Sequence, residues 1–220
     1  MNISIFDIIG PIMIGPSSSH TAGAARLSRV AAEIVNRPFS RVEFGLHGSF
    51  SKTGIGHGTD KALLAGALGI RENDERIKDV YPIAAASGIQ YSFCAVDLGD
   101  AHENTCRMTF WFPEGGYSVV TGSSIGGGRI VINEIDGVKT DICIEQPTLV
   151  IRHYDKKGVI SAITRLLSQE QLNISVMRLS REEKGGEALT VIETDDSISD
   201  NVVNGIRNLA HIIDVRVIRP

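Results

Sequence analysis

The chain contains 220 residues, of which 42% are hydrophobic and 22% charged, a composition typical of a globular protein rather than a disordered one. It carries 22 Lys and Arg against 26 Asp and Glu, and the net charge of −4 argues against nucleic-acid binding and against a polybasic membrane contact. No apolar run approaches the ~20 residues that span a bilayer. Met1–Ile14 has no basic residue and no cleavage pattern after it, so we expect a cytoplasmic protein without a signal peptide.

The three cysteines, Cys94, Cys106 and Cys143, are widely spaced and include no Cys-x-x-Cys pair. An odd number without paired spacing argues against a disulfide framework and against a zinc site. The same spacing is a poor match for the thiolate ligands of an iron–sulfur cluster. We therefore expect reduced, structural cysteines and no metal held by this chain.

The character of the sequence changes at Pro147, which cannot donate a hydrogen bond within a sheet and marks a boundary. We predict a first domain over 1–146 and a second over 147–220. The first domain combines helical apolar spacing with alternating strand patterns, so it is predicted to be mixed α and β with an antiparallel portion. Its expected elements are a helix over 19–36, a strand over 42–46, a helix over 59–68 capped by Thr59 and ended by Gly69, strands over 106–112 and 117–123, and a hairpin over 129–144.

The second domain has the clearer pattern. Strands are expected over 148–154, 174–179, 187–194 and 211–218, and amphipathic helices over 158–171 and 198–209. The resulting order, β-α-β-β-α-β, is that of the ferredoxin-like fold. A core of this size gains stability from association with a second copy.

The first candidate site is the segment from Gly15 to Gly23, Gly-Pro-Ser-Ser-Ser-His-Thr-Ala-Gly, at the start of the first predicted helix. Free backbone N–H groups and the helix dipole at that position favour an anion, and His20 can exchange a proton with it. The alternative is simple capping by one serine. We favour a functional site because three serines and a histidine between glycines exceed what a cap requires.

The second candidate is the glycine-rich segment Gly48–Asp60, which follows a predicted strand and precedes a predicted helix. It lacks the Gly-Lys-Ser/Thr ending of a phosphate-binding loop. We predict a loop that holds the imidazole of His57 at a helix N-terminus, where a neutral ring can act as a base. The alternative is a connecting loop with an incidental exposed histidine.

Weaker candidates lie elsewhere in the chain. His102-Glu103-Asn104 has the pattern of an ordinary turn, and 123–129 that of a strand break or bulge, with a ligand-approach loop as the alternative. In the second domain, the turn Asp155–Gly158 is either an ordinary loop or a small-ligand site at a helix N-terminus, with Asn173 on the opposite loop. Three histidines without an identifiable partner are assigned structural roles: His47, His153 and His211.

Taken together, these motifs resemble the beta chain of the two-chain, iron–sulfur-dependent L-serine dehydratase family (L-serine ammonia-lyase). The resemblance is carried by Gly15–Gly23, by Gly48–Asp60 with its ending Gly-His-Gly-Thr-Asp, and more weakly by His102-x-Asn104. Glu103 is a departure, because the family has proline there. Residues 148–219 resemble an ACT domain. The first domain resembles the family's beta domain, which is related to an allosteric domain of some phosphoglycerate dehydrogenases.

The resemblance implies the conversion of L-serine to pyruvate and ammonia in a complex with an alpha chain, as a heterodimer or a larger assembly. It implies a 4Fe–4S cluster on the alpha chain rather than on this chain, with a monovalent cation as a further candidate ligand. His57 and His20 match the motif histidines expected at the active site, His57 as acid or base and His20 in substrate positioning and proton handling. The other residues expected to contact substrate are Ser17, Ser18, Ser19, Thr21, Gly56, Gly58, Thr59, His102 and Asn104. Asp155, Gly158 and Asn173 are the candidate regulatory residues, and the ACT domain is a candidate for self-association.

Two other hypotheses remain open from the sequence. The chain could be a stand-alone amino-acid sensor, with a ligand domain and an ACT domain but no catalysis. It could also be a scaffold that only stabilises the alpha chain, in which case substitution of the histidines would have no effect on turnover.

Overall fold

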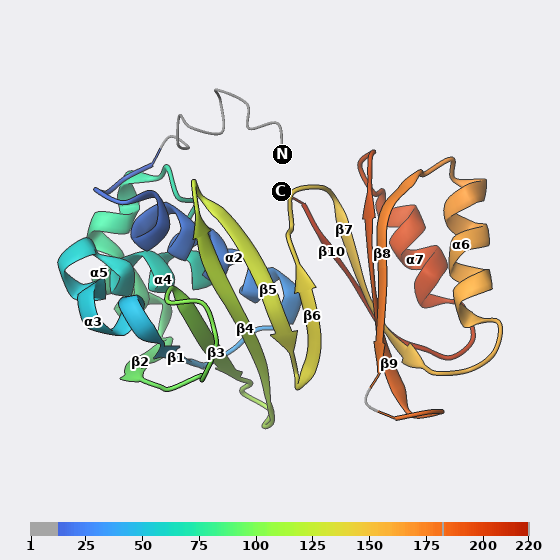
Figure 1. The fold of residues 1–220 in the computed structure, drawn as a ribbon, viewed down its shortest axis with the longest axis horizontal. Helices are drawn as coiled ribbons and strands as arrows, with labels where there is room; N and C mark the ends of the chain where they lie inside the picture. Colours follow the sequence, from blue (N-terminus) through green and yellow to red (C-terminus); the bar gives the residue numbers. More distant parts are fainter. Residues whose placement is uncertain (1–12, 182, 220) are drawn as a thin grey trace. The chain divides into compact units, whose positions relative to one another are not determined.

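A computed structural model of the chain describes residues 13–181 and 183–219. The prediction that Met1–Ile14 is not a signal peptide falls almost wholly outside these residues. The chain forms two compact units, one up to Gly137 together with Asp141–Cys143, the other made of Val138–Thr140 and the residues from Ile144 onward (Figure 1). The boundary predicted before Pro147 lies just inside the second unit. None of the helices in the described part of the chain has the length and apolar character needed to cross a membrane.

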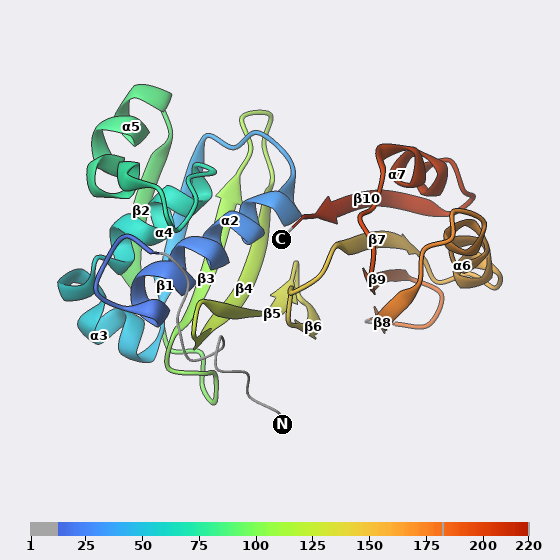
Figure 2. The same ribbon diagram turned by 90° about the horizontal axis from the view of Figure 1, so that it is seen from above.

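The larger sheet is six-stranded and has the order β2-β1-β3-β4-β5-β6 (Figure 2). β1 pairs with β2 in parallel, and the pairs β1–β3, β3–β4 and β4–β5 are antiparallel. The mixed α and β architecture predicted for the first domain is therefore confirmed. The strands are β1 (Arg41–Leu46), β2 (Gln90–Ala95), β3 (Thr105–Trp111), β4 (Tyr117–Gly126), β5 (Arg129–Ile135) and β6 (Val138–Ile142).

The apolar residues that predicted these elements form the core of the first unit. In α2 (Ala24–Val35) the helically spaced apolar side chains are 0 or 1% exposed. Leu27 packs directly on β4, where a Cβ atom on Gly122 would lie 2.6 Å from the Leu27 Cδ1 atom. The alternating side chains of β3, Cys106, Met108 and Phe110, are fully buried, as the period of two requires.

The strand end at 123–129 is a bulge, as predicted. The register of β4 against β5 shifts between Ser124 and Gly126, and Gly126 to Gly128 all have positive φ. The hairpin between β5 and β6 turns at Asp136 and Gly137, whose φ angles of 49° and 88° suit a tight turn.

The predicted loop over Gly48–Asp60 is wrong. Residues Gly48–His57 form a helix, α3, and a second helix, α4 (Thr59–Ala67), begins after a single left-handed residue, Gly58, with φ of 70°. Gly58, not Thr59, occupies the N-cap position of α4, and no side chain caps the helix. His57 therefore lies in the last turn of α3 as well as next to the start of α4.

Three elements were not predicted. The 3-10 helix η2 (Glu75–Asp79), the short helix α5 (Val80–Ser87) and the edge strand β2 lie between the second motif and β3. α5 contains Pro82 in its first turn, where proline is tolerated, and β2 is largely exposed. β2 therefore lacks the buried alternation on which the other strand predictions depend, and α5 buries only Val80 and Ala84, too few residues to define a helical pattern.

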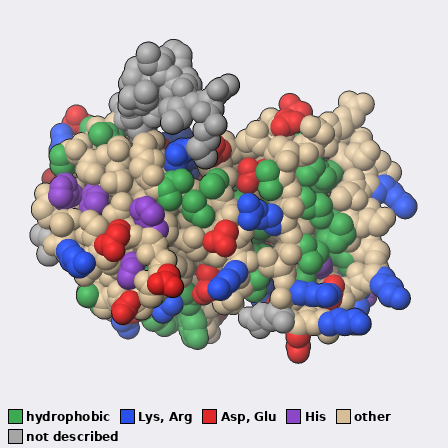
Figure 3. Space-filling model, viewed as in Figure 1, with side chains coloured by type: hydrophobic (Ala, Val, Ile, Leu, Met, Phe, Trp, Pro, Cys, Tyr) green, Lys and Arg blue, Asp and Glu red, His purple; other side chains and the backbone are tan. Residues whose placement is uncertain are grey.

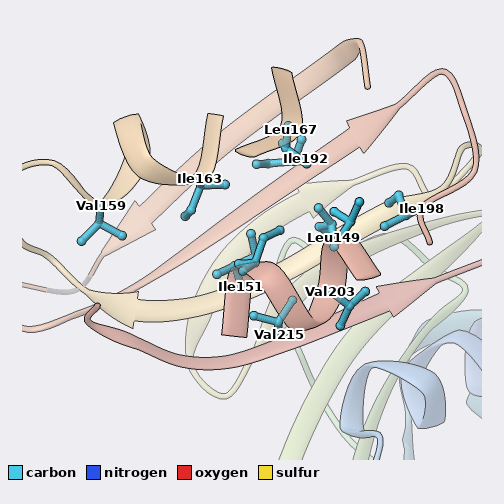
Figure 4. Packing of buried hydrophobic residues seen from close by; sticks show 11 residues of the cluster. Leu149, Ile151, Val159, Ile163, Leu167, Ile192, Ile198, Val203 and Val215 are labelled. Carbon is cyan, nitrogen blue, oxygen red and sulfur yellow. The ribbon is translucent and has the colours of Figure 1, made fainter. Parts of the chain in front are cut away.

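The second unit confirms the β-α-β-β-α-β order and the ferredoxin-like fold. Its antiparallel sheet has the order β10-β7-β9-β8, and the buried cluster from sheet and helices is shown in Figure 4. Burial of each aliphatic side chain in such a core contributes about 1.5–3 kcal/mol. The elements are β7 (Thr148–Tyr154), α6 (Val159–Gln169), β8 (Ile174–Arg181), β9 (Glu187–Thr194), α7 (Asp200–Arg207) and β10 (Ile212–Ile218).

Candidate active site

The first candidate motif forms a single π-helical turn, η1 (Ser18–Gly23), directly before α2. Ser17 is its N-cap and accepts a hydrogen bond from the backbone N–H of His20 at 3.1 Å, so one serine does act as a cap. A Cβ atom on Gly23 would lie 2.0 Å from Ser124 Oγ, so glycine allows the turn to lie against β4. π-helical turns are rare and occur frequently at functional sites.

The imidazole of His20 is held by side chains from two distant segments. Its Nδ1 atom lies 3.1 Å from Ser19 Oγ on the same turn. Its Nε2 atom lies 3.1 Å from Ser49 Oγ and 3.1 Å from Thr53 Oγ1, both on α3. The edge of the ring also packs on Phe50, with ring centroids 5.3 Å apart. The first two motifs therefore form one polar site.

His57 completes this site from the last turn of α3. Ser49, Thr53 and His57 are spaced by four residues and so share one face of the helix. The Thr21 hydroxyl donates to the backbone carbonyl of His57 at 3.1 Å, and the rings of His20 and His57 lie with their centroids 5.0 Å apart. Several histidine side chains reach the surface of the first unit in Figure 3.

The weaker third motif supports α3 through its backbone. The carbonyl of Glu103 accepts hydrogen bonds from the backbone N–H groups of Ser49 and Phe50, at 2.7 and 3.3 Å. These N–H groups belong to the first turn of α3, which lacks partners within the helix. A Cβ atom on Gly48 would lie 2.7 Å from this carbonyl, so the close approach requires glycine.

The side chains of this third motif lie apart from the two ring systems. The exposed His102 ring accepts a hydrogen bond from the backbone N–H of Asn104 through Nδ1 at 3.1 Å, which closes the predicted turn. Asn104 Nδ2 donates to the Ser124 carbonyl at 3.4 Å, whereas Asn104 Oδ1 and Ser124 Oγ are buried without a partner among the described residues. Among the described residues, no hydrogen bond or ring contact joins His102 or Asn104 to His20 or His57.

The remaining predicted contact residues surround the site without a bond to either ring. Ser18 is the first residue of η1, and Gly56 is exposed on α3 with open space beside its Cα atom. Thr59 is fully buried, and its hydroxyl has no partner among the described residues. Gly58 supplies the left-handed turn that separates α3 from α4.

Burial lowers the pKa of His20 below its usual value of about 6.5, and the nearby His57 lowers it further, while a hydrogen bond with the Ser49 backbone opposes the shift. The imidazole is therefore harder to protonate in the folded chain than in the unfolded chain. At pH 7 the ring is neutral, so one of its nitrogens can donate a proton and the other can accept one.

This shift predicts how the first unit responds to acid. Above pH about 6.5 His20 is neutral in both the folded and the unfolded chain, and its full contribution to stability is present. As the pH falls toward the lowered pKa of the folded chain, only the unfolded chain binds the proton. Stability should therefore decrease over that interval, and less steeply in His20→Gln. Urea unfolding followed by Trp111, the single tryptophan, measures this, with His102→Gln as the exposed control. Equal pH dependence in wild type and His20→Gln would contradict the prediction.

The regulatory residues predicted in the second unit are not brought together within one chain. The carboxylate of Asp155 accepts hydrogen bonds from Arg181, at 2.5 Å, and from the Gly185 backbone, at 3.0 Å. Asn173 instead bonds Asp195 at 2.5 Å, beyond the other ends of β8 and β9. Since β7 and β8 both pair antiparallel with β9, the end of β7 and the start of β8 lie at opposite edges of the sheet.

The three histidines assigned structural roles lie outside the site. Buried His47 accepts a hydrogen bond from the Leu98 N–H, and buried His153 contacts the Thr190 hydroxyl at 2.8 Å. His211 is exposed in the turn before β10, with φ of 70°.

The cysteines of this chain do not fit an iron–sulfur cluster. Cys106 is fully buried, and burial raises the pKa of its thiol well above the usual value, which disfavours the thiolate that ligates iron. Cys94 and Cys143 are exposed. Among residues 13–181 and 183–219, no group of three or more His, Cys, Asp or Glu side chains is suited to hold a metal ion.

Two residues of the site, Ser49 and Thr53, were not singled out from the sequence. Both lie in the glycine-rich segment that was expected to be a loop. In a loop, residues four positions apart do not share a face, so their spacing did not link them to His57. On a helix the same spacing places both hydroxyls on the face of His57. Ser124 lies in the segment 123–129, for which a ligand-approach loop was only the alternative, because its approach to Gly23 depends on the pairing of distant elements.

Comparison with known proteins gives the family. The family described as serine dehydratase beta chain matches residues 4–92, and the ACT domain family matches residues 148–211. The chain is 42% identical over 212 residues to a probable L-serine dehydratase beta chain of Bacillus subtilis, covering 96% of each chain. It is 39% identical to the L-serine dehydratase beta chain of Peptoniphilus asaccharolyticus, covering 92% of each. It is also 28% identical to a D-3-phosphoglycerate dehydrogenase of Bacillus subtilis, over 89% of this chain and 37% of that one.

The two beta-chain relatives match this chain over nearly its whole length, through both units described above. The resemblance inferred from the sequence motifs is thereby confirmed. The chain belongs to the serine dehydratase beta chain family, and its C-terminal unit is an ACT domain.

Proposed function

We propose that this chain, in complex with an alpha chain, supplies the acid–base residues of an iron–sulfur-dependent elimination that converts L-serine to pyruvate and ammonia. The observation that carries the proposal is the pair of imidazole rings of His20 and His57, 5.0 Å apart and surrounded by hydroxyl groups. The names of the relatives, L-serine dehydratase beta chains, support L-serine as the substrate and an alpha chain as the partner.

The reaction requires a base and a proton donor. Removal of the Cα proton and departure of the β-hydroxyl, which leaves as water once protonated, convert serine to aminoacrylate. Aminoacrylate tautomerises to the imine, and water then releases ammonia and leaves pyruvate. Imidazole groups near neutral pH are suited to both proton transfers, each worth about 10²–10⁴-fold in rate.

In this scheme His57 is the acid–base group, and its Nε2 atom receives the Cα proton. His20 positions the substrate and handles the second proton, together with the hydroxyls of Ser17, Ser18, Ser19 and Thr21. The lowered pKa of His20 supports this role, because the ring is neutral at pH 7 and can both donate and accept. We assign the outer contacts of the site to Gly56, Gly58, Thr59, His102 and Asn104.

We propose that the 4Fe–4S cluster is held by the alpha chain, because the thiols of this chain do not fit it. A monovalent cation is a further candidate ligand of the assembled enzyme. For the ACT domain we propose a regulatory role and self-association, with Asp155 and Gly158 at the start of α6 as candidate contacts. Asn173 could join them only from a second copy, since it lies at the other edge of the sheet.

The proposal predicts partner-dependent catalysis. This chain, mixed anaerobically with an alpha chain carrying a reconstituted cluster, should convert L-serine to pyruvate, whereas neither chain alone should do so. Pyruvate is followed continuously, and the cluster is monitored by its absorbance. Absence of pyruvate from a mixture with an intact cluster would contradict the proposal and favour the amino-acid-sensing hypothesis.

A further inference from the structure

The hydrogen bonds of Thr53 determine which atoms of the two histidine rings carry protons. Thr53 Oγ1 lies 3.0 Å from the carbonyl of Ser49, and a carbonyl can only accept. This is the shortest of the three contacts of the hydroxyl, the others being to His20 Nε2 at 3.1 Å and to Ser49 Oγ at 3.3 Å, and we assign the single hydroxyl proton of Thr53 to it. Thr53 Oγ1 also lies 3.1 Å from Nε2 of His20, and in that contact it can only accept. Nε2 of His20 must then carry the proton.

The opposite nitrogen of His20 follows from this assignment. A neutral imidazole carries one proton, so Nδ1 of His20 is left with a lone pair. That lone pair faces Ser19 Oγ at 3.1 Å, where the hydroxyl can donate. Ser49 Oγ, also 3.1 Å from Nε2, is a second acceptor for the same N–H, and it donates its own proton to the Thr53 hydroxyl, 3.3 Å away.

His57 is oriented by the backbone of the same threonine. Its Nδ1 atom lies 3.0 Å from the carbonyl of Thr53, so Nδ1 must be the donor. In the neutral ring Nε2 then has the lone pair, and no described residue bonds to it. The hydroxyl of Thr53 thus accepts a hydrogen bond from the His20 ring, and its backbone carbonyl accepts one from the His57 ring.

We propose that Thr53 is a positioning residue that sets the tautomers of both histidines, keeping Nε2 of His57 free to accept a proton and Nε2 of His20 protonated. The expected effect on catalysis rests on the proposed function. The assignment of the tautomers does not depend on it. Two chemically identical rings become one acceptor and one donor within a single site. The tautomer of a catalytic histidine strongly affects turnover in other enzymes that use one as a base.

The test compares Thr53→Val with Thr53→Ser. Valine has the shape of threonine but no hydroxyl, so Ser49 becomes free to donate to Nε2 of His20, and the His20 tautomer should become mixed. Serine keeps the hydroxyl and should restore the wild-type state. His57 should be unchanged in both variants, because its partner is a backbone carbonyl. In the assembled enzyme, kcat of Thr53→Val should fall about 10-fold with a smaller change in KM.

The tautomers are measured by nitrogen NMR of histidine-labelled chain without the alpha chain, at a pH where both rings are neutral. Thr164→Val is the matched control, because the Thr164 hydroxyl makes the same helical bond to the Ile160 carbonyl, at 3.0 Å, away from any histidine ring. An Nε2–H form of His57 in the wild type, or an unchanged His20 signal in Thr53→Val, would overturn the inference. If the tautomers are as proposed but the mixed chains make no pyruvate, the proposed function fails while the tautomer assignment stands.

Discussion

The substitution His57→Asn should reduce turnover of the assembled enzyme by about 10²–10⁴-fold, the usual contribution of a general base. The amide nitrogen of asparagine can take the place of Nδ1 and still donate to the Thr53 carbonyl, which His57 contacts at 3.0 Å. The variant therefore removes the free Nε2 atom while it preserves the bond that holds the side chain. We expect the loss in kcat, measured as pyruvate formed under anaerobic saturating serine.

The matched control is His211→Asn. His211 is exposed in the second unit and has a φ of 70°, which asparagine tolerates well. This variant should retain wild-type turnover. Both variants should show the wild-type urea midpoint when the fluorescence of Trp111 reports on the first unit. Wild-type turnover in His57→Asn would exclude His57 as the base, and it would favour the scaffold hypothesis if His20→Gln were equally active.

The parts of the fold that could be predicted are those in which side-chain period and burial agree. In the ACT domain each strand and helix has its own apolar pattern, and these residues form one buried cluster (Figure 4). In β3 the alternation of buried side chains likewise matches the period of a strand. Such elements can be recognised locally because the same side chains that define the pattern also form the core.

α3 could not be predicted, because its stability comes from distant residues. Gly54 and Gly56 each disfavour a helix interior by about 1 kcal/mol relative to alanine. Opposing this, Glu103 satisfies the first N–H groups of the helix, Thr21 bonds the His57 carbonyl at its end, and Phe50 is fully buried. The sequence shows the glycines but not the contacts that offset them.

The same error hid part of the site. The motif histidines could be selected from the sequence, whereas Ser49 and Thr53 acquire meaning only through the helical spacing of four that leads to His57. For the ACT domain the reverse holds. The predicted β-α-β-β-α-β order already implies that the first two strands are parallel, so the separation of Asp155 from Asn173 could have been deduced from topology.

The second large effect concerns the contact between α2 and α4. Gly66→Ala should destabilise the first unit by about 3 kcal/mol, near the upper end for overpacking. A Cβ atom there would lie 2.1 Å from the carbonyl oxygen of Ala25 and 2.8 Å from the backbone N of Arg29. Both neighbours are backbone atoms of α2, so no side-chain rotation can relieve the clash. The gain in helix propensity from alanine, about 1 kcal/mol, is too small to compensate. Urea unfolding followed by Trp111 fluorescence measures the change.

Gly56→Ala separates the gain in helix propensity from the steric clash. A Cβ atom at Gly56 meets nothing within 4 Å, and the φ of Gly56 is not positive. This variant should gain up to about 1 kcal/mol in the free energy of unfolding, so the two glycine-to-alanine changes should have opposite effects on stability.

The contact at Gly66 also matters for the site, because α2 continues from the turn that carries His20, and α4 follows directly after His57. If α2 and α4 are forced apart, the two rings should separate, and turnover should fall under conditions in which Gly66→Ala is still folded. Equal stability of Gly66→Ala and wild type would mean that the helices can move apart without cost, and that this contact does not fix the distance between the two histidines.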